Sequence, residues 1–296
     1  MPRAAARRRP KSTLSGLSGA LRAPFPGFIP PCLATPADHF PARGEWVHEI
    51  KHDGYRAQAH LQAGKSSVFT RNGYDWTARF KPIADALQAL GGHDLVLDGE
   101  IVVMDDRGAS DFHLLQDELA KKAPEQLTYL VFDLLYLDGF DLRGSCLQDR
   151  KRVLGQLLGT GFKEDSRIQL NPHIEADPSA LIAQACAMHL EGIVSKNIHS
   201  VYRSGRQEDW IKIKCAQTDT FPIIAFVEKL GASPPCTWAA GRANSCCMPV
   251  RLKPVFSSDP TEVPLRQRSA NLRWKKAHRD GTQKPRELVQ AQRRMR

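Results

Sequence analysis

One lysine in the stretch EIKHDGYR, residues 49–56, has neighbours that suit covalent chemistry. Lys51 lies between an apolar residue, Ile50, and an Asp-Gly pair. The Asp-Gly pair on its own indicates a plain β-turn. The alternative is that Lys51 attacks a phosphate, for which it must lose the proton that it carries at neutral pH. Burial or neighbouring cations would favour that loss.

Two further lysines could supply those cations and bind a chain of phosphates. Lys212 and Lys214 alternate in WIKIKC, which predicts that both lie on one face of a strand. Two ammonium groups on one face would hold a triphosphate and would favour the neutral form of a nearby lysine. The alternative for this pair is a solvated strand face.

Other side chains could bind a nucleotide or a metal ion. Glu100 follows the LDG segment and Glu191 opens EGIVSK, and carboxylates at strand ends can hold Mg²⁺. Phe132 in VFD could stack on a base, and Arg71 at the FTRNG turn could reach a phosphate or a sugar. Taken singly, each has an ordinary alternative, namely a surface acid, a core phenylalanine or a surface arginine.

Strands dominate the elements that must position these residues. Short strands around turns are predicted over 45–60 and 66–71, and a buried strand over 127–139. Residues 94–105 predict a hairpin, because apolar runs flank the favoured turn dipeptide Asp98-Gly99.

Two helices accompany the strands. One is predicted over 149–160, where a glycine ends the helical spacing, and another over 177–192, with Asp177 as the N-cap and Pro178 in the first turn. Because strands and helices mix irregularly, we expect an α+β domain over about 20–218. A second unit should begin with a strand near 221–231.

Composition narrows the class of protein. The 296 residues, 42% of them hydrophobic, suffice for one large or two ordinary domains. We expect no membrane span and no secretory signal, because no long apolar run occurs. The seven cysteines are scattered without a CxxC pair, which favours a reducing, cytosolic setting and argues against a disulfide framework or a zinc site.

The net charge of +10 lies in the ends of the chain. Residues 1–11 carry five Lys/Arg and no acid, and residues 252–296 carry twelve Lys/Arg against four Asp/Glu. The body between them is therefore slightly acidic. Net charge alone does not predict a nucleic-acid surface on that body.

The order of the motifs is more informative than any one of them. KHDGYR, TRNG, LDGE, FDLLYLDG, EGIVSK and WIKIK occur in one chain in this order. The series resembles the covalent nucleotidyltransferases and, within them, the ATP-dependent DNA ligases. The finer resemblance, over about 26–231, is to the ligase of bacterial non-homologous end joining.

The resemblance implies an architecture. A disordered basic arm over 1–22 would precede a nucleotidyltransferase (adenylation) domain of antiparallel sheets flanked by helices over 23–218. An OB-fold domain over 219–296 would follow.

The resemblance also implies roles for particular residues. Lys51 would be the adenylated nucleophile, and Lys212 and Lys214 would grip the α-phosphate. Glu100 and Glu191 would hold Mg²⁺ or Mn²⁺. The residues implied in ATP binding are Glu49, Lys51, Arg56, Arg71, Glu100, Phe132, Glu191, Lys212 and Lys214.

The implied reaction consumes ATP and joins a 3′-hydroxyl to a 5′-phosphate in nicked or broken double-stranded DNA, through a lysine–AMP intermediate. A DNA-end-binding protein is a candidate partner, and a cytoplasmic, nucleoid-associated location is implied. Two alternatives stay open. One is an RNA ligase or capping-type guanylyltransferase, and the other is an inactive nucleotide-binding remnant.

The chain departs from the family in the expected OB domain. FPIIAFVEKLGASPP suits its first strand, but residues 236–256 cluster cysteines and lack apolar alternation. Codons exist for which these residues, read from the third base of each codon, give YVGRRxGEQLLYAGKAQTGF, which resembles an OB hairpin. We therefore expect a frameshift near 232–236, an incomplete OB domain that is disordered after about 235, and impaired activity. A re-read of the DNA showing an uninterrupted frame would refute the frameshift.

Overall fold

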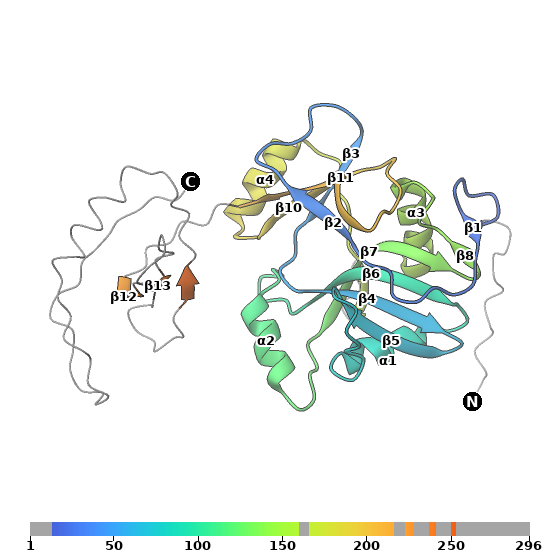
Figure 1. The fold of residues 1–296 in the computed structure, drawn as a ribbon, viewed down its shortest axis with the longest axis horizontal. Helices are drawn as coiled ribbons and strands as arrows, with labels where there is room; N and C mark the ends of the chain where they lie inside the picture. The colour runs from blue at the N-terminus through green and yellow to red at the C-terminus, as the bar shows by residue number, and fades with distance from the viewer. Residues whose placement is uncertain (1–13, 160–165, 216–222, 228–236, 241–249, 253–296) are drawn as a thin grey trace. The chain divides into compact units, whose positions relative to one another are not determined.

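A computed structural model describes residues 14–159, 166–215, 223–227, 237–240 and 250–252 (Figure 1). The chain divides into one unit over Met1–Cys215 and a second over Ala216–Arg296. No helix within the described ranges is long and apolar enough to cross a membrane.

The larger sheet of the first unit has seven strands and is almost wholly antiparallel. Its one parallel pair joins β7 to β9, which lies off the main path of the sheet. In sheet order the strands are β1 (Leu21–Arg22), β8 (Phe140–Asp141), β7 (Thr128–Leu137), β6 (Leu95–Val102), β4 (Tyr55–Gln62) and β5 (Lys65–Thr70), with β9 (Ile168–Leu170) beside β7.

A second sheet carries the motifs EGIVSK and WIKIK. It has four strands in the order β2 (Cys32–Pro36), β11 (Gly205–Lys214), β10 (Gly192–Asn197) and β3 (Trp46–Ile50). The chain passes from β3 directly to β4 of the larger sheet through the loop that contains Lys51. The candidate nucleophile therefore lies where the two sheets are joined.

Four helices are described, α1 (Lys81–Ala89), α2 (Phe112–Ala120), α3 (Leu147–Leu158) and α4 (Pro178–Ala187). The helices predicted over 149–160 and 177–192 correspond to α3 and α4. Asp177 caps α4 as predicted, because its carboxylate accepts a hydrogen bond from the Ala180 N–H (2.8 Å). The helix ends earlier than predicted, since the chain adopts a left-handed conformation at His189 (φ 58°) and turns into β10.

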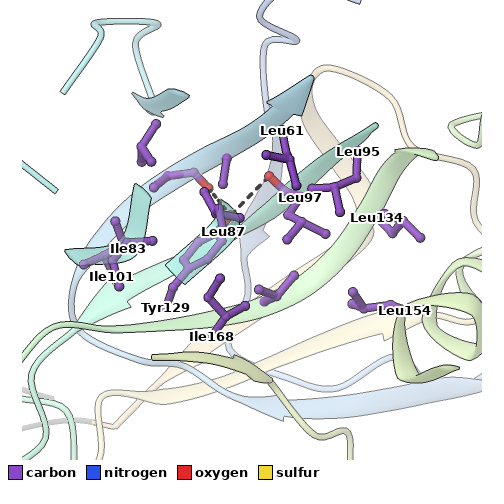
Figure 2. Packing of buried hydrophobic residues seen from close by; sticks show 14 of the residues in the cluster. Leu61, Ile83, Leu87, Leu95, Leu97, Ile101, Tyr129, Leu134, Leu154 and Ile168 are labelled. Atoms are coloured by element: carbon purple, nitrogen blue, oxygen red, sulfur yellow. Dashed lines mark hydrogen bonds between the residues drawn. The ribbon is translucent and has the colours of Figure 1, made fainter. Parts of the chain in front are cut away.

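The core lies against the larger sheet, where α1 and α3 pack on its strands (Figure 2). Leu61, Leu87 and Leu97 have no exposed surface. The buried Tyr129 hydroxyl donates to the main-chain carbonyl oxygens of Ala57 (3.0 Å) and Leu97 (3.1 Å), so the polar atom of that ring is satisfied. This packing fixes the positions of the strands of the larger sheet and of the residues that they carry.

The folded unit begins earlier than the sequence suggests. Leu14 and Leu17 are each only 7% exposed and belong to the core cluster, and β1 pairs with β8. Residues 14–22, predicted to be part of a disordered arm, are therefore packed. Residues 1–13 lie outside the described residues.

The hairpin predicted over 94–105 is wrong. Asp98 and Gly99 lie inside the continuous strand β6, at a register shift against β7. Glycine is needed there because a Cβ on Gly99 would lie 2.5 Å from the Leu130 carbonyl oxygen. The Asp-Gly pair thus marks a close approach of two strands rather than a turn.

The second unit contains an antiparallel sheet of three described strands, β12 (Ile223–Val227), β13 (Thr237–Ala240) and β14 (Val250–Leu252). The strand β12 lies within the range predicted for a strand, 221–231. Two strands, β13 and β14, fall in the segment predicted to be disordered. The other residues of that segment lie outside those described.

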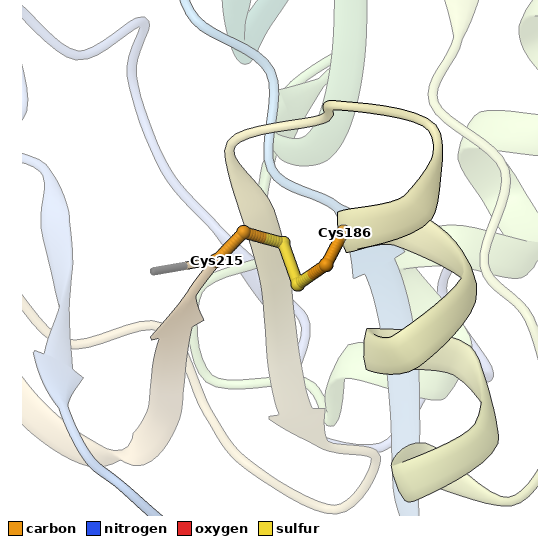
Figure 3. Close-up of a disulfide and its surroundings, with 2 residues drawn as sticks. All are labelled: Cys186 and Cys215. Carbon is orange, nitrogen blue, oxygen red and sulfur yellow. A yellow bond between two sulfur atoms is a disulfide. The ribbon is translucent and has the colours of Figure 1, made fainter. Parts of the chain in front are cut away.

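The scattered cysteines argue against a disulfide framework, and the described residues contain one disulfide. Cys186 and Cys215 are joined by a disulfide, 29 residues apart in the chain (Figure 3). The end of α4 and the end of β11 bring the two residues together, and no local spacing signals such a pair. Among the described cysteines, Cys32 and Cys146 are free.

Candidate active site

Lys51, Glu191 and Lys214 meet at one corner of the second sheet. The Lys51 ammonium group donates to Glu191 Oε2, and Lys214 Nζ lies 2.8 Å from Glu191 Oε1. The Lys51 side chain is 19% exposed and that of Glu191 is 20% exposed, whereas that of Lys214 is 60% exposed. One carboxylate therefore holds two lysines, of which one is the candidate nucleophile.

Strand pairing builds this corner. β10 pairs with β11 so that Gly192 lies opposite Lys214, and the Lys51 N–H donates to the Gly192 carbonyl oxygen (2.9 Å). Gly192 has φ 143°, and a Cβ there would lie 2.1 Å from the Ile213 carbonyl oxygen. Only glycine fits that position, which brings Glu191, Lys51 and the end of β11 together.

The predicted alternation of Lys212 and Lys214 is confirmed, because the intervening Ile213 is buried while both lysines are more open. Burial lowers the pKa of Lys212, and the charges of Lys51 and Lys214 lower it further. The more distant charges of Arg206 and Arg71 act in the same direction. These lysines and arginines form a region of positive potential that suits a polyanion such as a triphosphate.

Glu191 is an anion within this positive region. Burial alone would raise its pKa, but hydrogen bonds from Lys214 and Lys51 outweigh burial and hold the pKa below its usual value. The sequence suggested burial and cations around Lys51, and the structure adds this carboxylate as its direct partner.

Glu100 lies in the interior of β6 rather than after a turn, opposite Arg56 on β4. Burial raises the pKa of Glu100 to about 7, although the charges of Arg56 and Lys51 oppose the shift. The charge of Glu191 also acts on it, so the two carboxylates are within electrostatic reach of each other.

A metal ion at these carboxylates would have few protein ligands. The described part of the chain contains no group of three or more His, Cys, Asp or Glu side chains arranged to hold a metal. Two carboxylates fit Mg²⁺, which commonly takes one or two carboxylates and completes its shell with water and substrate phosphates.

Arg56 is tied into a buried polar network. Its guanidinium donates to both carboxylate oxygens of Asp98 (2.6 and 2.7 Å), and the Tyr202 hydroxyl donates to the same carboxylate (2.6 Å). The Asp98 side chain is 1% exposed. Arg56 is therefore fixed in orientation, at 4.4 Å from the centre of the Phe132 ring.

Phe132 is 7% exposed and packs in a second apolar cluster with Trp210. Lys196 Nζ lies 4.2 Å from the centre of the Phe132 ring and 4.0 Å from that of Trp210. The phenylalanine is thus a core residue, and a base stacked on it would meet cationic neighbours.

Glu49, predicted to bind ATP, lies in a cluster of buried charged side chains that includes Lys196. Its carboxylate accepts from Lys196 Nζ (2.8 Å) and Asn171 Nδ2 (3.1 Å) and lies 2.7 Å from Lys151 Nζ. Burial lowers the pKa of Lys196 to about 8, although Glu49 opposes the shift. Each oxygen of this carboxylate therefore contacts a lysine of the protein itself.

Sequence reasoning missed Lys196 and Lys151. Lys196 had a readable signal, because it closes EGIVSK and alternates with Val194, whereas Lys151 on α3 had none. Arg71 lies in an exposed turn after β5 and acts on the site through its charge on Lys212.

A cavity of about 1110 Å³ lies elsewhere, between α3 and the start of β3. Its lining includes Trp46, Gln148, Lys151 and His173. None of the nine predicted site residues lines it.

Comparison with known proteins supports the family resemblance that the order of the motifs predicts. The family described as "ATP dependent DNA ligase domain" matches residues 31–214. The multifunctional non-homologous end joining protein LigD of Pseudomonas aeruginosa is 41% identical over 217 residues, which are 73% of this chain and 25% of that protein. This chain thus spans about a quarter of the length of that relative.

Two solved structures are similar to this one. Mycobacterial DNA ligase D complexed with ATP and MES has a TM-score of 0.57 and 28% identity, over 71% of this chain and 67% of that chain. The ligase domain of M. tuberculosis LigD has a TM-score of 0.55 and 27% identity, with the same coverage of both chains. The α+β arrangement of antiparallel sheets described above is shared with these ligase domains.

Proposed function

The chain belongs to the ATP-dependent DNA ligase family, and from that premise we propose that it forms a covalent adenylate on Lys51 at the corner where Lys51, Glu191 and Lys214 meet. The Lys51 nitrogen would form a bond to the α-phosphorus of ATP. The bond from that phosphorus to the oxygen bridging to the β-phosphorus would break, and pyrophosphate would leave.

The lysines of β11 have an electrostatic role in this proposal. Lys212 and Lys214 lie on one face of the strand beside Lys51, where negative charge on the α-phosphate would develop. Fixed cations at that place stabilise the transition state more than the ground state. The contact of Glu191 with Lys51 would hold the amine in position until the nucleotide binds.

A divalent cation would supply further positive charge against the phosphate oxygens. Glu100 and Glu191 are the residues proposed to hold it, as carboxylates within electrostatic reach of each other. Glu191 would then share its carboxylate between such a cation and the Lys51 ammonium group.

The adenylate would then activate DNA. In this proposal the 5′-phosphate at a nick or break takes the AMP, and a 3′-hydroxyl attacks that phosphate and expels AMP. The P. aeruginosa relative is named as an end-joining protein, which makes broken double-stranded DNA the first substrate to test and a DNA-end-binding protein a candidate partner. We propose that sealing is weak, because we expect the OB domain to be incomplete.

Adenylation is tested by incubating the purified full chain with ATP labelled on the α-phosphate and Mg²⁺. We expect label on the protein, and none on Lys51→Ala. GTP in place of ATP is the control for a capping-type guanylyltransferase. Absence of label, or label that persists in Lys51→Ala, would overturn the proposal.

A further inference from the structure

The disulfide between Cys186 and Cys215 joins the end of α4 to the residue that follows β11 (Figure 3). Cys186 is the second-last residue of α4, and Cys215 directly follows Lys214 of β11. Their Cα atoms are 5.2 Å apart, within the range that a disulfide spans without movement of the backbone. Both residues are partly exposed.

The segment enclosed by this disulfide carries the charged groups of the site. Glu191, Lys212 and Lys214 all lie between the two cysteines in the chain. The Cys215 N–H also donates to the Glu191 carbonyl oxygen (3.0 Å). One main-chain hydrogen bond and one covalent bond thus fix the residue next to Lys214 against the turn that carries Glu191.

Without the covalent bond, the end of β11 has weaker restraints. Cys215 packs on a small apolar cluster formed by Leu181, Ala185 and Ile193, which is far smaller than the main core. Cys215 is also the last residue of the first unit. Beyond the pairing of Lys214 with Gly192, Cys215 is held by one main-chain hydrogen bond and this small cluster, and local opening at such a chain segment costs little free energy.

We infer that Cys186 and Cys215 form a reversible redox modification site whose disulfide holds the Glu191–Lys214 corner in the arrangement that adenylation needs. The reagent class is a small-molecule disulfide such as oxidised glutathione. One cysteine thiolate attacks that disulfide and releases one thiol, and the second cysteine then displaces the other thiol from the mixed disulfide. The two cysteines lose two electrons and two protons in total, and one disulfide is reduced to two thiols.

The effect on catalysis rests on the proposed function, whereas formation of the bond does not. The first test is therefore chemical. The full chain is incubated with oxidised glutathione or with dithiothreitol, free thiols are alkylated, and tryptic peptides are identified by mass. We expect peptides 168–196 and 215–229 linked to each other after oxidation and both alkylated after reduction. If oxidation leaves both peptides alkylated, or pairs these cysteines with others instead, the inference is overturned.

The second measurement compares thermal unfolding of the two forms. The oxidised form should unfold at a temperature higher by about 5 °C or more, because the cross-link restricts the unfolded chain. Cys186→Ser should show no such difference, whereas Cys146→Ser, which alters a free cysteine, should keep it. An unchanged difference in Cys186→Ser would contradict the inference.

The third measurement separates control of the corner from the proposed function. We expect the oxidised chain to adenylate roughly three- to tenfold faster than the reduced chain, because small misplacements of reacting groups slow a reaction strongly. We expect Cys186→Ser to adenylate at equal rates under both conditions. Equal rates in the wild-type chain would overturn control of the corner and leave adenylation standing. A disulfide with no adenylation in either form would refute the proposed function and, with it, the catalytic effect, while the modification site would stand.

Discussion

At the scale of the residue, the decisive arrangement is a single carboxylate between two lysines. Glu191 contacts Lys51 and Lys214 with different oxygen atoms, so each lysine is placed by a charged partner. The candidate nucleophile is thus held by an anion, close to the cations of β11. Under the proposed function, a nucleotide bound with a metal ion would change this balance of charge.

Lys214→Ala tests the role of the cations. Adenylation should fall by roughly 10²-fold or more, because a fixed charge on the reacting phosphate is lost. Stability should change by less than about 1 kcal/mol, since the ion pair with Glu191 is largely exposed on the lysine side. The rate of lysine labelling and the unfolding midpoint measure both effects. The exposed Lys65→Ala is the matched control, and an equal loss of rate there would contradict the assignment.

His60 gives a prediction of pH dependence. Burial lowers the pKa of His60 to about 4, and its Nε2 lies 2.9 Å from Gln58 Oε1. The unfolded chain therefore binds the proton more readily below pH 6.5, and this group should cost up to about 3 kcal/mol of stability as pH falls from 6.5 to 4. Denaturant unfolding of the wild type and of His60→Phe across that range measures the difference. If both curves fall in parallel, the assignment to His60 is wrong.

Some features of the candidate site could be predicted from the sequence better than others. Lys51, Glu191, Lys212 and Lys214 could be selected because their spacing and order point to a phosphate site, and the fold brings them together. The buried contact between Glu49 and Lys196 could not be predicted, because it joins residues far apart in the sequence. The binding roles of all nine predicted residues stay predictions.

At the scale of the element, close contacts between strands decide where glycine is required. Gly99→Ala should destabilise the protein by about 2 kcal/mol or more, since the new methyl group would meet the Leu130 carbonyl oxygen and the Tyr129 ring. Gly27→Ala is the control, because no atom lies within 4 Å of its added Cβ. Denaturant unfolding compares the two. Equal stabilities would contradict the close approach of β6 and β7.

The elements that could be predicted are those with strong local signals. The apolar run of β7 and the Asp-Pro start of α4 have such signals. The dipeptide Asp98-Gly99 misled because the same residues serve a turn and a close approach of strands. Neither α1 nor α2 is among the helices predicted from the sequence, although Ile83, Ala84 and Leu87 of α1 have helical spacing.

At the scale of the whole molecule, the first unit depends on its N-terminal residues. Two shortened chains test this dependence, one without residues 1–13 and one without residues 1–22. Removal of residues 1–22 should cost about 3 kcal/mol or more, since the buried Leu14 and Leu17 are lost together with the pairing of β1. Unfolding midpoints of the two shortened chains give the comparison, and equal midpoints would show that residues 14–22 contribute nothing.

Charged residues and motifs are distributed differently along the chain. The excess of Lys and Arg lies mainly at the two ends, whereas every candidate site residue lies in the first unit. The motif order predicted the family, which the match over residues 31–214 confirms. The three short strands described in the second unit do not test the predicted OB domain, because a few paired strands do not define a barrel.

The central claim is that Lys51 captures AMP. The most direct measurement is mass spectrometry of the full chain after incubation with ATP and Mg²⁺, with the modified residue located by peptide fragmentation. We predict an increase in mass equal to one AMP, located on Lys51 and absent from Lys51→Arg. An unmodified Lys51, or AMP on another residue that Lys51→Arg retains, would contradict the claim.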